Sequence, residues 1–347
     1  MLSLMESGGI GLWISLLVTP LVMRFLLRRR IGQHIREDGP ATHIVKAGTP
    51  TMGGLAIVAA AVIGYGMGHV GTEVPFTRPG TLVVLAVVTF GAIGFVDDSI
   101  KVRHKRSLGL QKRGKLIAQV AAGVLFAELA VHWAHTSTAL SFTRVQTPGL
   151  RLGEVGWVIL ATLVLVATSN AVNLTDGLDG LAAGSSTFCF AVLAIMGYWE
   201  SRHTGIYHVQ AASALGLAIC AVALAGSCLG FLWWNAAPAR IIMGDTGSLG
   251  IGSGLAAICL LLNLDLLLPI IGGLFVIETL SVIAQVVSFR AFGRRVFRMA
   301  PIHHHCELLG WPETTVIVRF WVLGGLFAAF GLGIFYAQFL TATHFVQ

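Results

Sequence analysis

Acidic side chains stand beside the ends of several long apolar segments in this 347-residue sequence. Asp97 and Asp98 close one such segment, Asp176 and Asp179 follow another, and Asp245 precedes a third. An ionisable group inside hydrocarbon is costly unless it is paired or has a function. Carboxylate oxygens are also ligands that Mg²⁺ prefers, usually one or two per ion together with phosphate oxygens and waters. These residue types therefore favour a site that holds a divalent cation and phosphate groups.

The adjacent pair Asp97 and Asp98 is poorly placed for stability alone. Two neighbouring carboxylates repel each other, so one pKa should rise unless a cation or a metal neutralises the pair. The dipole of a helix also disfavours acids near its carboxyl-terminal end, where this segment places them. The alternative is a solvated helix end, because Lys101 and Arg103 follow closely. We favour a functional role for the pair.

Asn173, Asp176 and Asp179 recur every three residues after an apolar segment. If the helix continues through them, an amide and two carboxylates lie on one face and could hold hydroxyls, a base edge or Mg²⁺. The alternative is a polar loop in which Asp179 is the N-cap of the next helix. No Lys or Arg lies in this loop, which favours a ligand as the partner of the acids.

Asp245 lies between Gly244 and Gly247, with Thr246 and Ser248 as hydrogen-bond donors. A carboxylate on such a turn suits a divalent ion that bridges phosphates. An N-cap for the helix that follows is an equal alternative at this stage.

Three consecutive histidines, His303, His304 and His305, form the last polar run, with Glu307 close behind. They are poor ligands for one zinc ion, because three neighbouring side chains do not readily converge on a single tetrahedral ion. Contact with phosphate, or proton transfer by imidazole, is the better hypothesis. A further run extends from Lys46 through Pro50 and Thr51 to two glycines, whose backbone amides could approach an anion.

The segments that must position these residues are apolar enough to cross a membrane. The chain is 55% hydrophobic and 11% charged, against about 25% charged residues in an average soluble domain. We predict an all-α, polytopic integral membrane protein with about ten transmembrane helices and one membrane domain over residues 1–347. The approximate spans are 8–27, 51–70, 81–96, 116–134, 155–172, 181–198, 211–234, 249–264, 266–287 and 316–340.

The Lys and Arg residues orient the spans. Nineteen lie at one set of span ends and four at the other, and cytoplasmic loops are the ones enriched in these residues. The rule predicts that both termini lie outside and that all the polar runs lie on the cytoplasmic side. The net charge of +7 then favours anionic headgroups and substrates, whereas nucleic acid is disfavoured because the cations are divided among loops.

The order of these motifs, from about residue 38 to 320, closely resembles the MraY family, the phospho-N-acetylmuramoyl-pentapeptide transferases. The resemblance is carried by Asp38-Gly-Pro40, the Lys46 to Gly54 run, Asp97-Asp98-Ser-Ile-Lys101, Asn173 to Gly180, Phe231 to Asn235, Met243-Gly-Asp245 and Pro301 to Trp311. It implies transfer of phospho-MurNAc-pentapeptide from its UDP carrier to undecaprenyl phosphate, which gives lipid I and UMP. It also implies a homodimer in the bacterial inner membrane.

The resemblance further implies roles for single residues. Asp97, Asp98 and Asp245 are similar to the family's catalytic positions: the first two lie near the attacking lipid phosphate, and Asp245 holds Mg²⁺. A second set is similar to positions that line the nucleotide and pyrophosphate cleft, namely Lys46, Thr51, Lys115, Asn173, Asp176, Asp179, Asn235, His303, His304 and His305. Direct transfer and a covalent aspartyl intermediate both stay open.

Two alternatives remain. A related transferase could use UDP-GlcNAc as its donor. A secondary transporter is a different class, and it predicts polar groups and unwound helices in the middle of spans. Here the polar groups lie at span ends.

Overall fold

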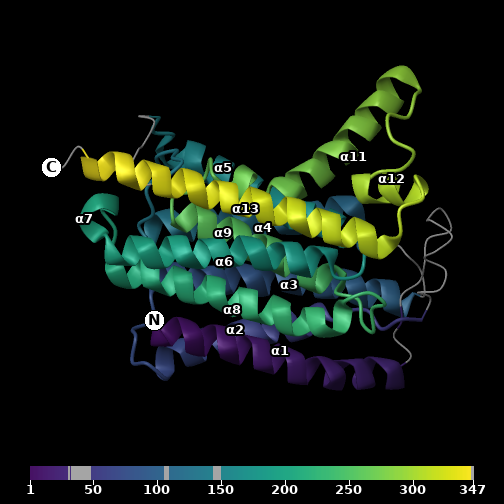
Figure 1. Ribbon diagram of the computed structural model, residues 1–347, viewed down its shortest axis with the longest axis horizontal. Coiled ribbons are helices and arrows are strands. Elements are labelled where there is room, and N and C mark those ends of the chain that lie inside the picture. Colours follow the sequence, from purple (N-terminus) through teal and green to yellow (C-terminus); the bar gives the residue numbers. More distant parts are fainter. Residues whose placement is uncertain (30–31, 33–47, 105–108, 144–149, 345–347) are drawn as a thin grey trace.

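The computed structural model describes residues 1–29, 32, 48–104, 109–143 and 150–344, and the helices in this part of the chain form one bundle (Figure 1). The only extended pairing among the described residues is two isolated bridges, Gly32 with Pro50 and Ala139 with Arg151. The helices are α1 (Leu2–Arg28), α2 (Gly54–Val70), α3 (Arg78–Arg103), α4 (Lys112–His132), α5 (Gly153–Thr175), α6 (Leu181–Arg202), α7 (Thr204–Tyr207), α8 (Ala211–Asn235), α9 (Gly244–Leu261), α10 (Leu268–Ile271), α11 (Gly273–Phe292), α12 (Ile302–Leu308) and α13 (Glu313–His344).

Nine of the helices in the described residues are long and apolar enough to cross a membrane, which confirms a polytopic membrane protein. The remaining expected span, 51–70, corresponds to α2, which is apolar but has only 17 residues. At 1.5 Å per residue it is about 25 Å long, slightly less than a hydrocarbon core of about 30 Å. The expected span 266–287 begins later than expected, at Gly273, because the short helix α10 comes first and ends at Gly272, which is also the N-cap of α11.

Helix α9 lies at the centre of the bundle. The most apolar part of α9 is 94% buried, against 22% for the corresponding parts of α1 and α11. Its sequence is rich in small residues, and these let neighbouring backbones come close. A methyl group at Gly252 would clash with the backbone of Thr168 and Ser169 on α5. The small-residue spacing therefore serves helix packing.

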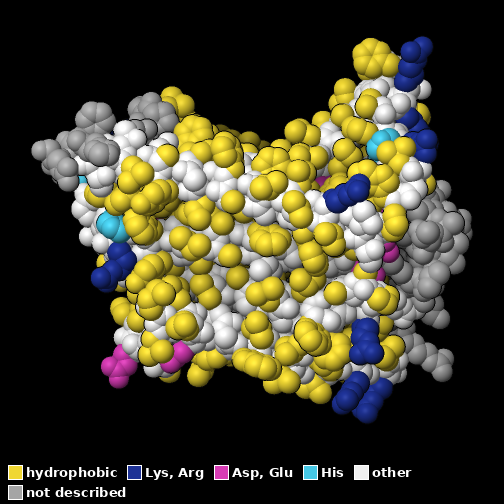
Figure 2. Space-filling view, in the orientation of Figure 1, with side chains coloured by type: hydrophobic (Ala, Val, Ile, Leu, Met, Phe, Trp, Pro, Cys, Tyr) yellow, Lys and Arg dark blue, Asp and Glu magenta, His cyan; other side chains and the backbone are white. Residues whose placement is uncertain are grey.

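The bundle has two unlike ends. The described chain ends of α1 and α13 lie together at one end, and α11 leaves the bundle near the other end and carries α12 (Figure 1). Most of the Lys and Arg side chains visible in Figure 2 lie at the α11 and α12 end, and hydrophobic side chains cover the middle of that face. This distribution suits a protein whose apolar belt faces lipid.

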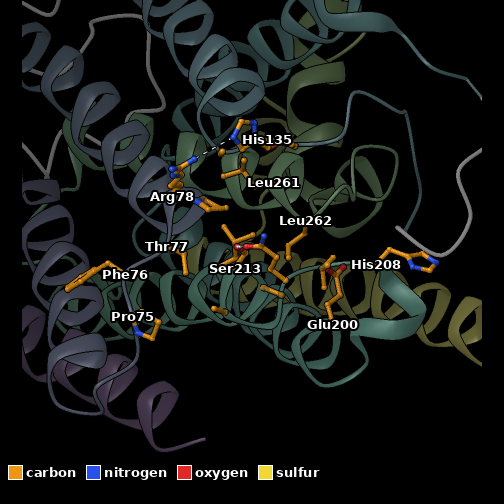
Figure 3. A pocket seen from close by; sticks show the side chains of 18 residues that line it. Pro75, Phe76, Thr77, Arg78, His135, Glu200, His208, Ser213, Leu261 and Leu262 are labelled. Carbon is orange, nitrogen blue, oxygen red and sulfur yellow. Dashed lines mark hydrogen bonds between the residues drawn. The ribbon is translucent and has the colours of Figure 1, made fainter.

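A cavity of about 670 Å³ lies where α3 begins, and Arg78 is at its edge (Figure 3). The guanidinium of Arg78 donates to the carbonyl of Trp133 over 3.0 Å and lies 3.4 Å from His135 Nε2. Glu200 and Ser213 also line this cavity. Because Asp97 and Asp98 lie near the other end of the same 26-residue helix, the cavity is distant from the acidic residues.

Candidate active site

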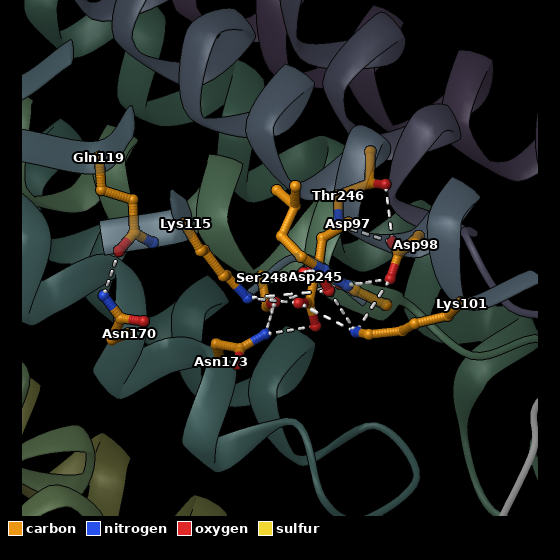
Figure 4. A network of polar contacts seen from close by, with 12 residues as sticks. Asp97, Asp98, Lys101, Lys115, Gln119, Asn170, Asn173, Asp245, Thr246 and Ser248 are labelled. Atoms are coloured by element: carbon orange, nitrogen blue, oxygen red, sulfur yellow. Dashed lines mark hydrogen bonds and ion pairs between the residues drawn. The ribbon is translucent and has the colours of Figure 1, made fainter. Parts of the chain in front are cut away.

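Asp97, Asp98 and Asp245 form one cluster, although they come from two helices (Figure 4). One carboxylate oxygen from each lies within 4.8 Å of the others. Asp97 and Asp98 are 2% and 3% exposed near the end of α3, and Asp245 stands in the first turn of α9. The two helices can approach closely because Gly94 has no side chain. A methyl group at this position would collide with the carbonyl oxygen of Asp245. Motifs 147 residues apart in sequence thus meet in space.

Asp98 caps the amino-terminal end of α9. Its carboxylate accepts hydrogen bonds from the backbone of Asp245 at 3.2 Å, from the backbone of Thr246 at 3.0 Å and from Thr246 Oγ1 at 2.8 Å. The first N–H groups of a helix lack partners within it, and the helix dipole is positive there, so this end stabilises an anion. The residue at the N-cap itself, Met243, makes no side-chain cap. The hypothesis that Asp245 serves as the N-cap is therefore wrong.

Two lysines neutralise most of the cluster's charge. Lys101 Nζ lies 2.7 Å from Asp97 Oδ2 and 3.0 Å from Asp245 Oδ2. Lys115 Nζ, from α4, lies 2.5 Å from Asp245 Oδ2 and 4.0 Å from Asp97 Oδ2. Lys115 was expected in the site. Lys101 was not predicted as a site residue, although its position four residues after Asp97 on a helix is a sufficient signal.

Asn173 completes the surroundings of Asp245. Its amide donates to Asp245 Oδ1 and to Ser248 Oγ, both at 2.8 Å. The expected common face of Asn173, Asp176 and Asp179 is wrong, because α5 ends at Thr175. Asp176 lies just past that end, where desolvation and the charges of Asp245 and Asp98 raise the pKa of its carboxyl well above its usual range. A raised pKa favours the neutral form of the carboxyl, so Asp176 adds little negative charge beside Asp245.

Asp179 and Asn235 hold the segment that connects α8 to α9. The backbone N–H of Ala239 donates to Asp179 Oδ2 at 2.9 Å. Asn235 is 3% exposed: its Oδ1 accepts from Gly180 at 3.1 Å and its Nδ2 donates to the carbonyl of Ile241 at 2.9 Å. These bonds give both residues a structural task, and their contact with substrate stays a prediction.

The run that begins at Lys46 is described in part. Lys46 itself lies outside the described residues. Thr51 lies beside Gly244, where its Oγ1 would be 3.2 Å from an added Cβ. The backbone N–H groups of Gly53 and Gly54 donate to the carbonyls of Ile242 and Met243 at 2.9 and 2.8 Å. These two amides are thus occupied, and the hypothesis that they bind an anion is wrong.

The three histidines have three different partners. His303 Nδ1 lies 3.0 Å from Glu278 Oε2, and both side chains are 0% exposed. His304 Nδ1 lies 2.7 Å from Glu307 Oε2. His305 Nδ1 accepts from the backbone of Arg298 at 3.1 Å. The three rings thus turn to separate partners, and among the described residues the grouping with metal-ligand spacing consists of the three aspartates alone.

His303 connects the histidine run to the loop after α5. A methyl group at Gly177, next to Asp176, would collide with the ring nitrogen of His303. The backbone N–H of Asp179 also donates to Glu313 Oε1 at 3.2 Å. Helix α12 and the start of α13 are thereby placed beside the loop that contains Asp176. Contact of the histidines with phosphate stays a prediction.

Sequence reasoning missed Glu278, the partner of His303. It is the one acid in the apolar stretch 266–287, and a buried ionisable group in such a stretch is a functional signal by itself. Glu313 was missed as well. Its signal was weaker, because an acid in the first turn of a helix is common and stabilises the helix end.

The residues present fit a divalent cation. Three carboxylates face two ammonium groups, which leaves one negative charge in excess. Every atom in the cluster that could bind a metal is a carboxylate oxygen, the ligand type that hard cations such as Mg²⁺ prefer. Asp97 Oδ1 accepts from the backbone of Leu110 at 2.8 Å, which orients that carboxylate toward Lys101 and Lys115.

The fold and the cluster agree with the comparisons with known proteins. The model of glycosyl transferase family 4 matches residues 81–263, which include Asp97, Asp98, Lys101, Asn173 and Asp245. The chain is thus a membrane-embedded member of glycosyl transferase family 4. Signature 1 of the phospho-N-acetylmuramoyl-pentapeptide-transferases matches residues 46–58, the run that contains Lys46 and Thr51.

Relatives cover nearly the whole chain. Phospho-N-acetylmuramoyl-pentapeptide-transferase of Frankia alni is 49% identical over 96% of this chain and 97% of its own length. The proteins of the same name from Pseudarthrobacter chlorophenolicus and Streptomyces avermitilis are each 46% identical, with at least 97% of every chain covered. The chain belongs to the phospho-N-acetylmuramoyl-pentapeptide-transferase (MraY) family.

The contact between Glu278 and His303 can be tested through stability. Glu278→Leu should lower the free energy of unfolding by about 1–3 kcal/mol, because it leaves the buried imidazole without its partner. Glu278→Gln keeps an acceptor and should lose less. The double variant with His303→Leu should recover part of the loss, since the two sites are coupled. Denaturant titration in detergent measures these values, and equal stability of Glu278→Leu and the parent chain would contradict the pairing.

Proposed function

We propose that this protein transfers phospho-MurNAc-pentapeptide from UDP-MurNAc-pentapeptide to undecaprenyl phosphate, giving lipid I and UMP for peptidoglycan synthesis. The observation that carries the proposal is the buried cluster of three carboxylates and two lysines at one end of a membrane bundle. Family membership over nearly the full chain supports the choice of substrates. The same family membership argues against the alternative that the protein is a secondary transporter.

In this proposal the reaction exchanges one phosphoanhydride for another and needs no separate energy source. Asp245 is the proposed Mg²⁺ ligand, and the ion would neutralise negative charge on the pyrophosphate of the donor. Lys101 and Lys115 supply two further cations at the same place. Fixed charges and the positioning of both substrates account for most of the catalysis in phosphoryl transfer.

Asp97 is the better candidate for the base that accepts the proton of the attacking lipid phosphate. Asp98 accepts three hydrogen bonds from Asp245 and Thr246 and a longer one, of 3.5 Å, from Lys101, so it is the more fully engaged carboxylate and acts as a positioning residue. Asp97 accepts one backbone hydrogen bond and lies beside the lysines. An imidazole from the run His303 to His305 and the side chains of Thr51 and Asp176 would then contact the donor.

The orientation is part of the proposal. Helix α2 begins beside α9, where a methyl group at Gly54 would collide with the backbone of Gly247, and α3 begins at the far end of the bundle. The chain therefore passes from one end to the other through α2, which supports ten crossings with both termini on the same side. The distribution of Lys and Arg residues supports the outside as that side. The single membrane domain, residues 1–347, would carry its active site on the cytoplasmic face of the bacterial inner membrane. A homodimer stays a prediction from the family likeness.

Accessibility of single cysteines tests this orientation. In a background with Cys306→Ser, an impermeant thiol reagent added to intact cells should label Arg202→Cys, at the end of α6, and should not label Arg294→Cys, beyond α11. Both positions are exposed, so both should react once the membrane is permeabilised. Labelling of Arg294→Cys in intact cells would contradict a cytoplasmic site.

The donor is tested by incubating membranes that contain the protein with undecaprenyl phosphate and a labelled nucleotide sugar. We expect labelled lipid from UDP-MurNAc-pentapeptide and none from UDP-GlcNAc. Membranes without the protein are the control. Label in lipid from UDP-GlcNAc alone would establish the related transferase activity in place of the one proposed.

Asp245→Asn tests the metal ligand. It removes the charge that faces Lys101 and Lys115, and we expect turnover to fall about 100- to 1,000-fold, as for loss of one preorganised electrostatic group. The Mg²⁺ concentration for half-maximal activity should rise as well. Glu154→Gln is the matched control, because this exposed acid lies at the start of α5. Unchanged activity of Asp245→Asn at every Mg²⁺ concentration would refute the assigned role.

A further inference from the structure

A second cavity, of about 600 Å³, lies between α11 and the return segment, residues 293–301, which leads to α12. It is on the part of the molecule that leaves the bundle in Figure 1. Its lining combines arginine side chains, Arg290, Arg295 and Arg298, with apolar ones that include Val282, Val286 and Phe289. None of the three aspartates of the cluster lines it.

Gln285 fixes the return segment against α11. Its Oε1 accepts from the backbone of Val296 at 3.0 Å and of Phe297 at 2.9 Å, and its Nε2 donates to the carbonyl of Phe297 at 3.1 Å. Ser288 Oγ donates to the carbonyl of Arg294 at 2.9 Å. The cavity is therefore held by hydrogen bonds on two successive turns of α11.

The charged groups that line the cavity all have one sign. Arg290, Arg295 and Arg298 line it, and none of the described residues that line it is an acid. Arg298 donates to the carbonyl of Leu308 at 2.5 Å, whereas Arg290 and Arg295 are exposed. A guanidinium presents a planar set of donors that matches two oxygens of a phosphate. The polar part of the cavity is thus complementary to a phosphate group.

The apolar part of the cavity is exposed as well. Val286 is 44% exposed and Phe289 is 55% exposed, on a helix long and apolar enough to lie in a membrane. Basic residues beside an apolar surface at a membrane interface attract anionic lipids. A ligand that satisfies both parts must carry a phosphate and a hydrocarbon chain.

We propose that this cavity binds the headgroup of an anionic phospholipid, with its phosphate at Arg290 and Arg295 and an acyl chain along Val282, Val286 and Phe289. None of the described residues that line the cavity has a carboxylate that could hold a metal or act as a base, so this lipid is not a substrate. Its binding would hold the return segment, which contacts the histidine run where the backbone of Arg298 donates to His305. The proposal concerns a resident lipid and does not depend on the identity of the donor.

Native mass spectrometry of the full chain, with phosphatidylglycerol and phosphatidylcholine in competition, tests the proposal. We expect phosphatidylglycerol to be retained, and Arg290→Gln and Arg295→Gln each to weaken its binding about fivefold, which corresponds to about 1 kcal/mol per cation. Arg294→Gln is the matched control, since Arg294 is exposed on the same segment but does not line the cavity. The affinity of Arg294→Gln for phosphatidylglycerol should stay within twofold of that of the parent chain.

Two results would overturn the proposal. An equal loss in Arg294→Gln would show that the arginines act only through general surface charge. Displacement of the bound lipid by undecaprenyl phosphate at equal concentration, with no preference for phosphatidylglycerol over phosphatidylcholine, would make the cavity a site for the acceptor lipid. Thermal unfolding of each variant, compared with the parent chain, shows whether the fold is retained.

Discussion

The capping of α9 by Asp98 is the contact on which the site depends. It joins the carboxyl-terminal part of α3 to the amino-terminal end of α9, so a negative side chain lies where the helix dipole is positive. Charge-assisted hydrogen bonds of this kind are about twice as strong as neutral ones. Because the bonds are made to the backbone of Asp245 and Thr246, they also set the direction in which the side chain of Asp245 leaves the helix. That side chain then meets Lys101, Lys115 and Asn173.

Close packing makes this contact possible. The approach of α3 to α9 requires glycine at position 94, and the first residue of α9 must be glycine, Gly244, because its φ is +74°. An added Cβ at Gly244 would lie 2.8 Å from Asp98 Oδ2. Glycine is the residue that adopts this backbone conformation without a steric penalty. The small residues of the sequence and its acids therefore serve one arrangement, since the first bring the second together.

The sequence predicts the members of the site better than it predicts their contacts. Span ends and residue types were sufficient to bring Asp97, Asp98, Asn173 and Asp245 to one place, and the family resemblance added Lys115. They were not sufficient to show that Asp98 caps another helix, because that bond joins residues 147 positions apart and depends on how α3 packs against α9. Spacing by three residues misled for Asp176 and Asp179, since α5 ends at Thr175. The sequence marks Glu278 as a lone acid in an apolar stretch, but it does not indicate that His303 is its partner.

The central place of α9 explains how so many charges can lie at the end of a membrane helix. A charge that faced lipid would be costly, whereas a charge at the end of a buried helix can be surrounded by other side chains. Helix α9 is almost completely covered by its neighbours, and the acids and lysines at its amino-terminal end come from α3, α4 and α9 itself. Each carboxylate there has a cation, an amide or a backbone N–H as a partner. The fold can therefore keep a charged site at the membrane interface because its most polar helix end belongs to its least exposed helix.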